Sequence, residues 1–282
     1  MQFDPYVFGV LSAVAASIFF GVTNLIYLRM SEDISVMDIM FTRFWVSLPF
    51  AFFFAVGSVG TTNITIPADA MIPLAVSMIL GLVLGDSMYF LSQSRIGVSR
   101  AFPISMSYPL LVYIISATFL GEPIILQRII GVVITVAGVI LIARAEQNES
   151  PNEKGRWNER DKRIGFALAI LTALAWALSD AIFQFGLVSV GAAESNYFRM
   201  LVVSIILVPI FFVSMKGGRK LPAKRITGMA LVTGLFGVGF SLIAYSYAVK
   251  FVGATVTAVI ISSAPIFTAP LSALYLNEDV NR

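Results

Sequence analysis

Two acidic residues lie in the middle of long apolar stretches, where charged side chains are rare. Asp86 stands in LGLVLGDSMYFLSQS and Asp180 in ALAWALSDAIFQFG. A charge at the middle of a membrane costs about 2.5–3.5 kcal/mol on insertion scales, so such a group usually faces a cavity or a partner. A buried carboxyl group can also take up and release protons. We therefore expect Asp86 and Asp180 to contact a bound small molecule or to carry protons.

Polar and aromatic side chains surround these acids at helical spacing. They recur at positions i, i+3, i+4 and i+7, which places them on one face of a helix. Three such faces are formed by Asp86, Tyr89, Phe90 and Gln93, by Trp176, Ser179, Asp180 and Phe183, and by Phe20, Thr23, Asn24 and Tyr27. Together they predict a central cavity for a small molecule. Thr23, Asn24 and Ser179 are equally suited to hydrogen bonds that hold helices together.

Two arginines, Arg43 and Arg199, each lie about five residues inside an apolar segment. Asp38 and Glu194 precede them by five residues, which is poor spacing for an ion pair on one helix. We favour a structural role, in which each arginine reaches the membrane surface or pairs with another helix. The alternative is contact with an anionic group of a substrate.

Prolines interrupt two of the apolar segments. Pro109 in SMSYPLLVY and Pro265 in SSAPIFTAP predict kinks, because proline frees a carbonyl one turn earlier and bends the helix axis. Such kinks occur beside binding sites, but packing alone also explains them. Glu122 in FLGEP precedes Pro123, which is typical of a helix start, and Glu278 in YLNED is its counterpart.

The composition indicates an integral membrane protein. The 282 residues are 58% hydrophobic and 12% charged, whereas a soluble domain carries roughly 25% charged residues. The absence of Cys and His excludes disulfides, thiolate metal sites, cysteine nucleophiles and histidine bases. We expect no metal, no cofactor and no catalytic residues. The basic loops are explained as signals of membrane topology, so they give no case for nucleic-acid binding.

Nine apolar segments are long enough to cross a bilayer, which needs about 20 residues per helix. We predict an all-α fold, because an open sheet cannot satisfy its backbone in lipid. The predicted spans cover residues 8–29, 37–59, 71–92, 99–120, 124–144, 164–188, 194–214, 226–249 and 252–276.

The charged connections predict the orientation in the membrane. Residues 144–163 contain six Lys and Arg, and residues 215–225 contain five. Two predicted helices separate these loops, so both lie on one side, and the positive-inside rule makes that side cytoplasmic. Residues 60–70 and 189–193 contain no Lys or Arg. We therefore expect a multi-pass protein of the cell (plasma) membrane with its N-terminus outside.

An internal repeat relates the two halves of the chain. A shift of 156 residues aligns the sequence with itself without a gap from residue 9 to residue 278. Identical pairs are Gly9 with Gly165, Arg43 with Arg199, Gly81 with Gly237, Tyr89 with Tyr245, Gly97 with Gly253, Ser107 with Ser263, Pro109 with Pro265, and Glu122 with Glu278.

The repeat predicts a domain organisation. Residues 1–145 form a first five-helix repeat, 146–163 a basic linker and 164–282 a second repeat. Five is odd, so the second half enters the membrane with opposite polarity, as in many secondary transporters. The partner of 124–144 would occupy about 280–300, whereas the sequence given ends at residue 282. We expect nine helices here and a missing tenth.

These motifs resemble the drug/metabolite transporter (DMT) superfamily, and most closely its ten-helix EamA-like branch. The resemblance rests on FFGVTN and AWALSD, on FTRFW and YFRML, and on SMSYPLL…FLGEPI with SSAPIFT…YLNED. It implies an inverted repeat around a central cavity. The cavity-facing candidates that it implies are Asn24, Asp86, Tyr89, Tyr108, Asp180, Tyr245 and Ser262. The N-outside orientation predicted above opposes the usual N-inside arrangement of the family.

The favoured function is that of a secondary transporter, an exporter or exchanger of small metabolites, amino acids or drugs that works by alternating access. The expected partners are a small-molecule substrate and the lipid bilayer, and both a monomer and a homodimer stay open. A non-transporting sensor or scaffold is the alternative. An intramembrane enzyme or a channel is less favoured, because neither a catalytic cluster nor a filter-like motif is evident. No Walker motif indicates ATP-driven transport.

Overall fold

The computed structural model describes residues 4–30, 36–149, 158–216 and 224–264. All regular secondary structure within these ranges is helical, which confirms the all-α prediction for this part of the chain. The elements are α1 Pro5–Met30, α2 Val36–Val59, η1 Thr61–Asn63, α3 Ala68–Met78, η2 Ile79–Gly85, α4 Asp86–Ile96, α5 Val98–Ser105, α6 Tyr108–Phe119, α7 Leu126–Glu149, α8 Glu159–Gly186, α9 Ala192–Lys216, α10 Lys224–Gly234, η4 Leu235–Phe240 and α11 Ser241–Ser262.

Six helical stretches in the described ranges are long and apolar enough to cross a membrane. They are Pro5–Thr23, Ala68–Ile96, Arg100–Phe119, Glu159–Gly186, Ala192–Val213 and Thr227–Ser262. Two shorter apolar stretches, Arg43–Val59 and Leu126–Leu141, accompany them. This supports a multi-pass membrane protein, while the count of nine spans stays a prediction.

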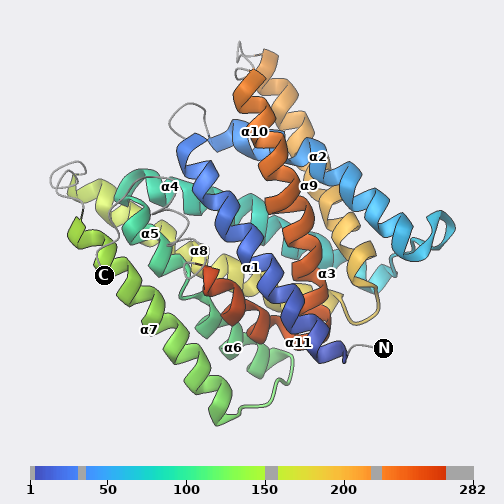
Figure 1. The fold of residues 1–282 in the computed structure, drawn as a ribbon, viewed down its shortest axis with the longest axis horizontal. Coiled ribbons are helices and arrows are strands. Elements are labelled where there is room, and N and C mark those ends of the chain that lie inside the picture. Colours follow the sequence, from blue (N-terminus) through green and yellow to red (C-terminus); the bar gives the residue numbers. More distant parts are fainter. Residues whose placement is uncertain (1–3, 31–35, 150–157, 217–223, 265–282) are drawn as a thin grey trace.

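The helices form one bundle in which distant parts of the chain lie side by side (Figure 1). Helix α1 packs along α11, α8 packs along α3 and α4, and α2 packs against α9. In this view α7 and α2 lie at opposite edges. Small buried side chains, among them Ala16, Ala173, Ala177, Ala254 and Ala258, line the contacts of α1, α8 and α11. Such residues let helix backbones approach closely where lipid supplies no hydrophobic drive.

Two spans contain a π-helical segment that hydropathy did not predict. Residues Ile79–Gly85 (η2) join α3 to α4, and Leu235–Phe240 (η4) join α10 to α11. Each segment is rich in glycine, and a neighbouring helix packs directly against it. A Cβ added to Gly81 would lie 2.5 Å from Ser179 Oγ, so only glycine fits this contact. Since π-helical turns occur often at functional sites, these segments indicate where to search for one.

The predicted span 99–120 consists of two helices. Helices α5 and α6 are separated by a turn at Met106 and Ser107, and Pro109 lies in the first turn of α6. The interruption therefore precedes Pro109, as expected because proline lacks the N–H and its ring clashes with the carbonyl four residues earlier. Whether this break serves a binding site stays a prediction.

Glu122 does not begin a helix, so that prediction is wrong. Helix α7 begins at Leu126, four residues later. The backbone N–H of Glu122 donates to the Ser116 carbonyl, and its Oε2 accepts from Arg128 Nη1 at 3.0 Å. The residue therefore ties the α6–α7 connection to the first turn of α7, which is still a structural role.

Gly97 and Gly253 bend the chain at equivalent places of the repeat. Their φ angles are +78° and +86°, which lie in the region that favours glycine. Gly97 separates α4 from α5, and Gly253 interrupts α11. After the second break, the Ala254 N–H donates to Gln184 Oε1 on α8, which satisfies a donor released by the kink.

Some predictions fall outside the described residues. These are the kink at Pro265, the role of Glu278 and the tenth helix. Asn24 belongs to α1, but the structure does not describe its side chain.

Candidate functional site

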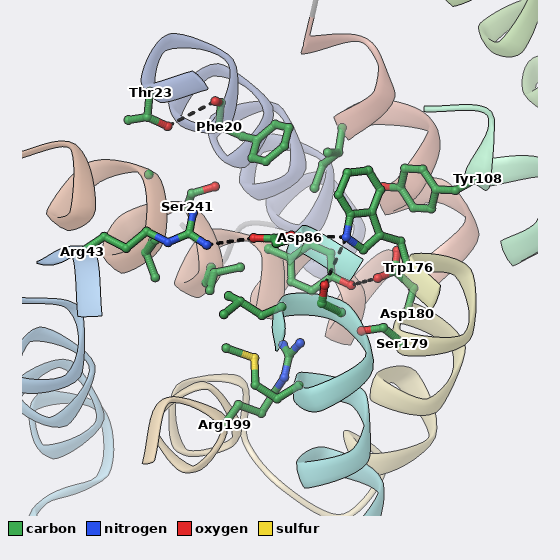
Figure 2. Close-up of a pocket in the computed structure, with 18 of the residues that line it drawn as sticks. Phe20, Thr23, Arg43, Asp86, Tyr108, Trp176, Ser179, Asp180, Arg199 and Ser241 are labelled. Carbon is green, nitrogen blue, oxygen red and sulfur yellow. Dashed lines mark hydrogen bonds and ion pairs between the residues drawn. The ribbon is translucent and has the colours of Figure 1, made fainter. Parts of the chain in front are cut away.

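A cavity of about 140 Å³ lies at the centre of the bundle (Figure 2). Its wall is formed by residues of α1, α2, α3, η2, α4, α6, α8, α9, η4 and α11, so both halves of the chain contribute. Its polar lining consists of Thr23, Arg43, Asp86, Tyr108, Ser179, Asp180, Arg199, Ser241 and Tyr245. Its apolar lining includes Phe20, Met78, Leu82, Met106, Trp176, Val238, Leu242 and Ile261. A mainly apolar wall with a few polar groups is typical of a small-molecule site.

On one side of the cavity an ion pair joins two helices. Arg43 Nη2 on α2 donates to Asp86 Oδ2 at 2.8 Å, and only 6% of the arginine side chain is exposed. Asp86 Oδ1 accepts from Trp176 Nε1 at 3.3 Å. Both carboxylate oxygens of Asp86 therefore have a donor, as Figure 2 shows.

The π-helical segment η2 places Asp86 and receives Trp176. Asp86 is the first residue of α4, directly after η2. Within η2, the Gly81 carbonyl accepts a second hydrogen bond from Trp176 Nε1, at 3.1 Å. The Ser179 hydroxyl, one helical turn further along α8, donates to the Ser77 carbonyl at 2.7 Å. The Gly81 carbonyl of η2 and the Ser77 carbonyl of α3 thus accept hydrogen bonds from α8, and these bonds hold the indole ring at the cavity wall.

On the other side of the cavity, Asp180 binds a tyrosine. Tyr245 Oη on α11 donates to Asp180 Oδ1 at 2.5 Å, and the Tyr245 ring stacks on Phe183 with centroids 5.5 Å apart. Asp180 Oδ2 is buried and has no hydrogen-bond partner among the described residues. The two acids of the cavity therefore differ, because Asp180 keeps one oxygen for another group.

Arg199 on α9 completes this side of the cavity. Its guanidinium carbon lies 3.8 Å from the centroid of the Phe183 ring, and the residue is 4% exposed. Cation–π contact of this kind stabilises a desolvated guanidinium. Within the described part of the chain, Nε and Nη1 of Arg199 have no hydrogen-bond partner, and no carboxylate oxygen lies within 4.0 Å of them.

Comparisons with known proteins agree with this architecture. The model of the EamA-like transporter family matches residues 7–144 and 163–282, which is most of the chain. The chain belongs to this family. An uncharacterized transporter of Archaeoglobus fulgidus is 23% identical to this EamA-like protein over 276 residues, which cover 96% of the chain and 91% of the relative.

The fold of this EamA-like protein also occurs in a solved structure. A crystal structure described only as that of a protein matches it with a TM-score of 0.76 and 16% sequence identity, and covers 97% of this chain and 90% of the other. At that identity the likeness concerns the fold alone.

The structure brings four of the seven candidate residues of the EamA-like chain to one cavity. Asp86, Tyr108, Asp180 and Tyr245 line it. Tyr89 is buried behind Trp176, with ring centroids 5.3 Å apart, and does not line the cavity. Ser262 is fully buried and also does not line the cavity.

The two arginines, which are equivalent in the repeat, have different environments in the structure. A structural role was favoured for both, and the interhelical ion pair of Arg43 agrees with that alternative. Arg199 neither reaches the surface nor forms such a pair among the described residues. The signal was present, because these two are identical residues at equivalent positions of the repeat. In the described ranges no group of three or more acidic residues is placed to hold a metal ion.

Proposed function

We propose that this EamA-like protein is a secondary transporter that moves a small organic molecule through the central cavity by alternating access. The observation that carries the proposal is the cavity itself. It is lined by helices of both halves, with two carboxylates, two guanidinium groups and aromatic rings in an otherwise apolar bundle. Charged groups at such depth usually mark a substrate or ion pathway.

We propose further that the two halves form an inverted repeat. Several contacts support it, because a contact between the halves recurs when each residue is replaced by its repeat equivalent in the other half. A Cβ on Gly237 would meet Thr23, just as one on Gly81 would meet Ser179. The same holds for Gly9 against Val252 and Gly165 against Ile96. A repeated pattern of contacts lets two conformations exchange by rocking one half against the other.

Of the two acids, Asp180 is the better placed proton carrier. Both oxygens of Asp86 accept from a cation or an indole, whereas Asp180 Oδ2 has no partner in the described part of the chain. We also propose that the transport is export or exchange across the cell membrane. The charge distribution of the loops supports placing residues 144–163 and 215–225 in the cytoplasm.

Reconstitution tests the transporter proposal. The purified protein in liposomes is screened with radiolabelled metabolites, amino acids and drugs, with and without a pH gradient. Trp176→Ala removes the largest side chain of the cavity wall, and we expect its uptake rate to fall roughly tenfold or more. Trp45→Ala is the matched control, since Trp45 is 54% exposed on α2 and does not line this cavity.

Two results would count against the proposal. Solutes that bind but never accumulate beyond protein-free liposomes, under any gradient, would favour a non-transporting sensor or scaffold. Equal losses in the Trp176 and Trp45 variants would show that the central cavity is not the path.

A further inference from the structure

The repeat gives the cavity two equivalent arginines, but their environments differ. Arg43 is bound by Asp86 at 2.8 Å. The repeat equivalent of Asp86 is residue 242, 43 positions after Arg199, and it is Leu242 rather than an acid. The second guanidinium therefore has no carboxylate at the repeat-equivalent position. Asp180 lines the same cavity and attracts Arg199 electrostatically, but within the described ranges no carboxylate oxygen lies within 4.0 Å of Arg199.

We propose that Arg199 is the anchor for the carboxylate group of the transported molecule, so that the substrate is a small organic carboxylate. This inference rests on the proposed function, in which the central cavity binds a small solute. Figure 2 shows Arg199 extending from α9 toward the cavity, on a different side from Arg43. A substrate carboxylate that binds there pairs with Arg199 as the Asp86 carboxylate pairs with Arg43.

The energetics of burial favour this assignment. An arginine stays charged in a protein and carries five N–H donors. A buried charge without a partner is strongly unfavourable, yet Arg199 is 4% exposed with Nε and Nη1 unsatisfied among the described residues. The Phe183 ring offsets part of this cost without using the N–H donors. An anionic ligand satisfies both the charge and the donors.

The rest of the site narrows the class of molecule. Asp180 Oδ2, buried and without a donor in the described ranges, is an acceptor for an O–H or N–H group of the ligand. The rings of Phe20 and Trp176 and the side chains of Met78 and Leu82 suit an apolar body. Because Asp86 already pairs with Arg43, Arg199 is the guanidinium left for a ligand, and the carboxylate of Asp180 lines the same cavity. A singly charged carboxylate therefore fits better than a doubly charged phosphate. The site thus fits a small carboxylate that also bears a hydroxyl or amino group.

Matched acid and amide pairs test the proposal. The probes are lactate and lactamide, mandelate and mandelamide, and leucine and leucinamide, which differ in charge at the same carbon skeleton. Their Kd values are measured on the purified protein, and counterflow is measured in liposomes. We expect at least one acid to bind roughly 10- to 100-fold more tightly than its amide, the range of a hydrogen bond to a charged group.

Three variants locate the effect. Arg199→Gln should abolish the preference for the acid, and Arg199→Lys should keep part of it, because lysine retains the charge but lacks the planar donors. Arg95→Gln is the control, because Arg95 pairs with Asp161 outside the cavity, where its side chain is 36% exposed. Thermal unfolding of each variant shows whether it is folded. If Arg199→Gln does not fold, the acid preference is tested with Arg199→Lys.

The outcomes separate the two proposals. An unchanged acid preference in both Arg199 variants, or the absence of binding by any acid of the panel, overturns the role of Arg199. Transport of neutral or cationic solutes that is insensitive to Arg199→Gln leaves the transporter standing and removes this inference. Tight, Arg199-dependent binding of an acid without counterflow supports the inference and removes the transporter proposal.

Discussion

At the scale of single residues, partners decide what each charged side chain in the cavity can do. Arg43 and Asp86 form an ion pair between two helices. Asp180 is held at one oxygen by Tyr245 and has no partner at the other among the described residues. The first pair is therefore best suited to hold the bundle together, and Asp180 to exchange protons or ligands.

Breaking the ion pair should destabilise the protein. Arg43→Met leaves Asp86 as a charge without its cation, at a cost of about 3 kcal/mol or more in unfolding free energy. The double variant Arg43→Met/Asp86→Asn should recover much of the loss, because the orphaned charge is gone. Arg95→Met, in a half-exposed pair, should cost less than about 1 kcal/mol. Unfolding in detergent measures all three, and an equal loss for Arg43 and Arg95 would contradict the structural role.

A proton-carrying Asp180 predicts a specific pH effect. Asp180→Asn has a side chain of similar size that cannot ionise, so transport by this variant should no longer respond to a pH gradient. Asp86→Asn should change the transport rate without removing the response. Solute uptake at several internal and external pH values measures both. If only Asp86→Asn loses its pH dependence, the roles of the two acids are the reverse of those proposed.

At the scale of elements, the π-helical segments contribute close contacts between the two halves. Segment η2 presents Gly81 and its carbonyl group to α8, and η4 presents Gly237 to α1. A hydropathy profile treats both regions as ordinary spans, because it averages apolar residues. It does not detect the extra residue per turn that distinguishes a π-helix from an α-helix. The close contacts require glycine because a Cβ has no room there.

The glycine contact predicts a stability change with an internal control. Gly81→Ala places a methyl group 2.5 Å from Ser179 Oγ, and overpacking of this kind costs about 1–3 kcal/mol. Gly81→Ala/Ser179→Ala should recover part of the loss, although the hydrogen bond to Ser77 disappears. Gly131→Ala on α7 is the matched control, with no atom within 4 Å of the added Cβ. Melting temperatures that fall equally for Gly81 and Gly131 would refute this contact.

At the scale of the whole molecule, the repeat explains why one cavity lies at the centre. Equivalent helices of the two halves both line it, α1 with α8 and α2 with α9. The sequence differences between the halves then make the site asymmetric. Position 24 is Asn where its repeat partner is Asp180, and position 242 is Leu where its repeat partner is Asp86.

Membrane orientation is testable because the chain has no native cysteine. We expect Asn63→Cys to react with a membrane-impermeant maleimide in intact cells. Arg219→Cys, at the repeat-equivalent position, and Glu159→Cys should react only after permeabilisation. Labelling of Asn63 and Arg219 from the same side would overturn the inverted repeat. The opposite pattern at all three positions would keep the repeat and place the N-terminus in the cytoplasm.

The sequence by itself determined the class of protein, the positions of most helices and the register of the repeat. These depend on local properties: apolar runs of about 20 residues, glycine and proline at fixed places, and an offset of 156 that needs no structure to detect. Asp86 and Asp180 were found for the same reason, because a charge in an apolar run stands out without knowledge of its neighbours.

Only the tertiary structure decided which of these residues share a cavity and which partner each has. Arg43 and Asp86 are 43 positions apart in the sequence, and Tyr245 and Asp180 are 65 apart. Helical spacing relates only residues on one helix, so it predicts neither contact. Tyr89 and Tyr245 are repeat equivalents, yet only Tyr245 lines the cavity. Burial and partner choice arise from packing between distant helices, which is why the difference between Arg43 and Arg199 appears only in three dimensions.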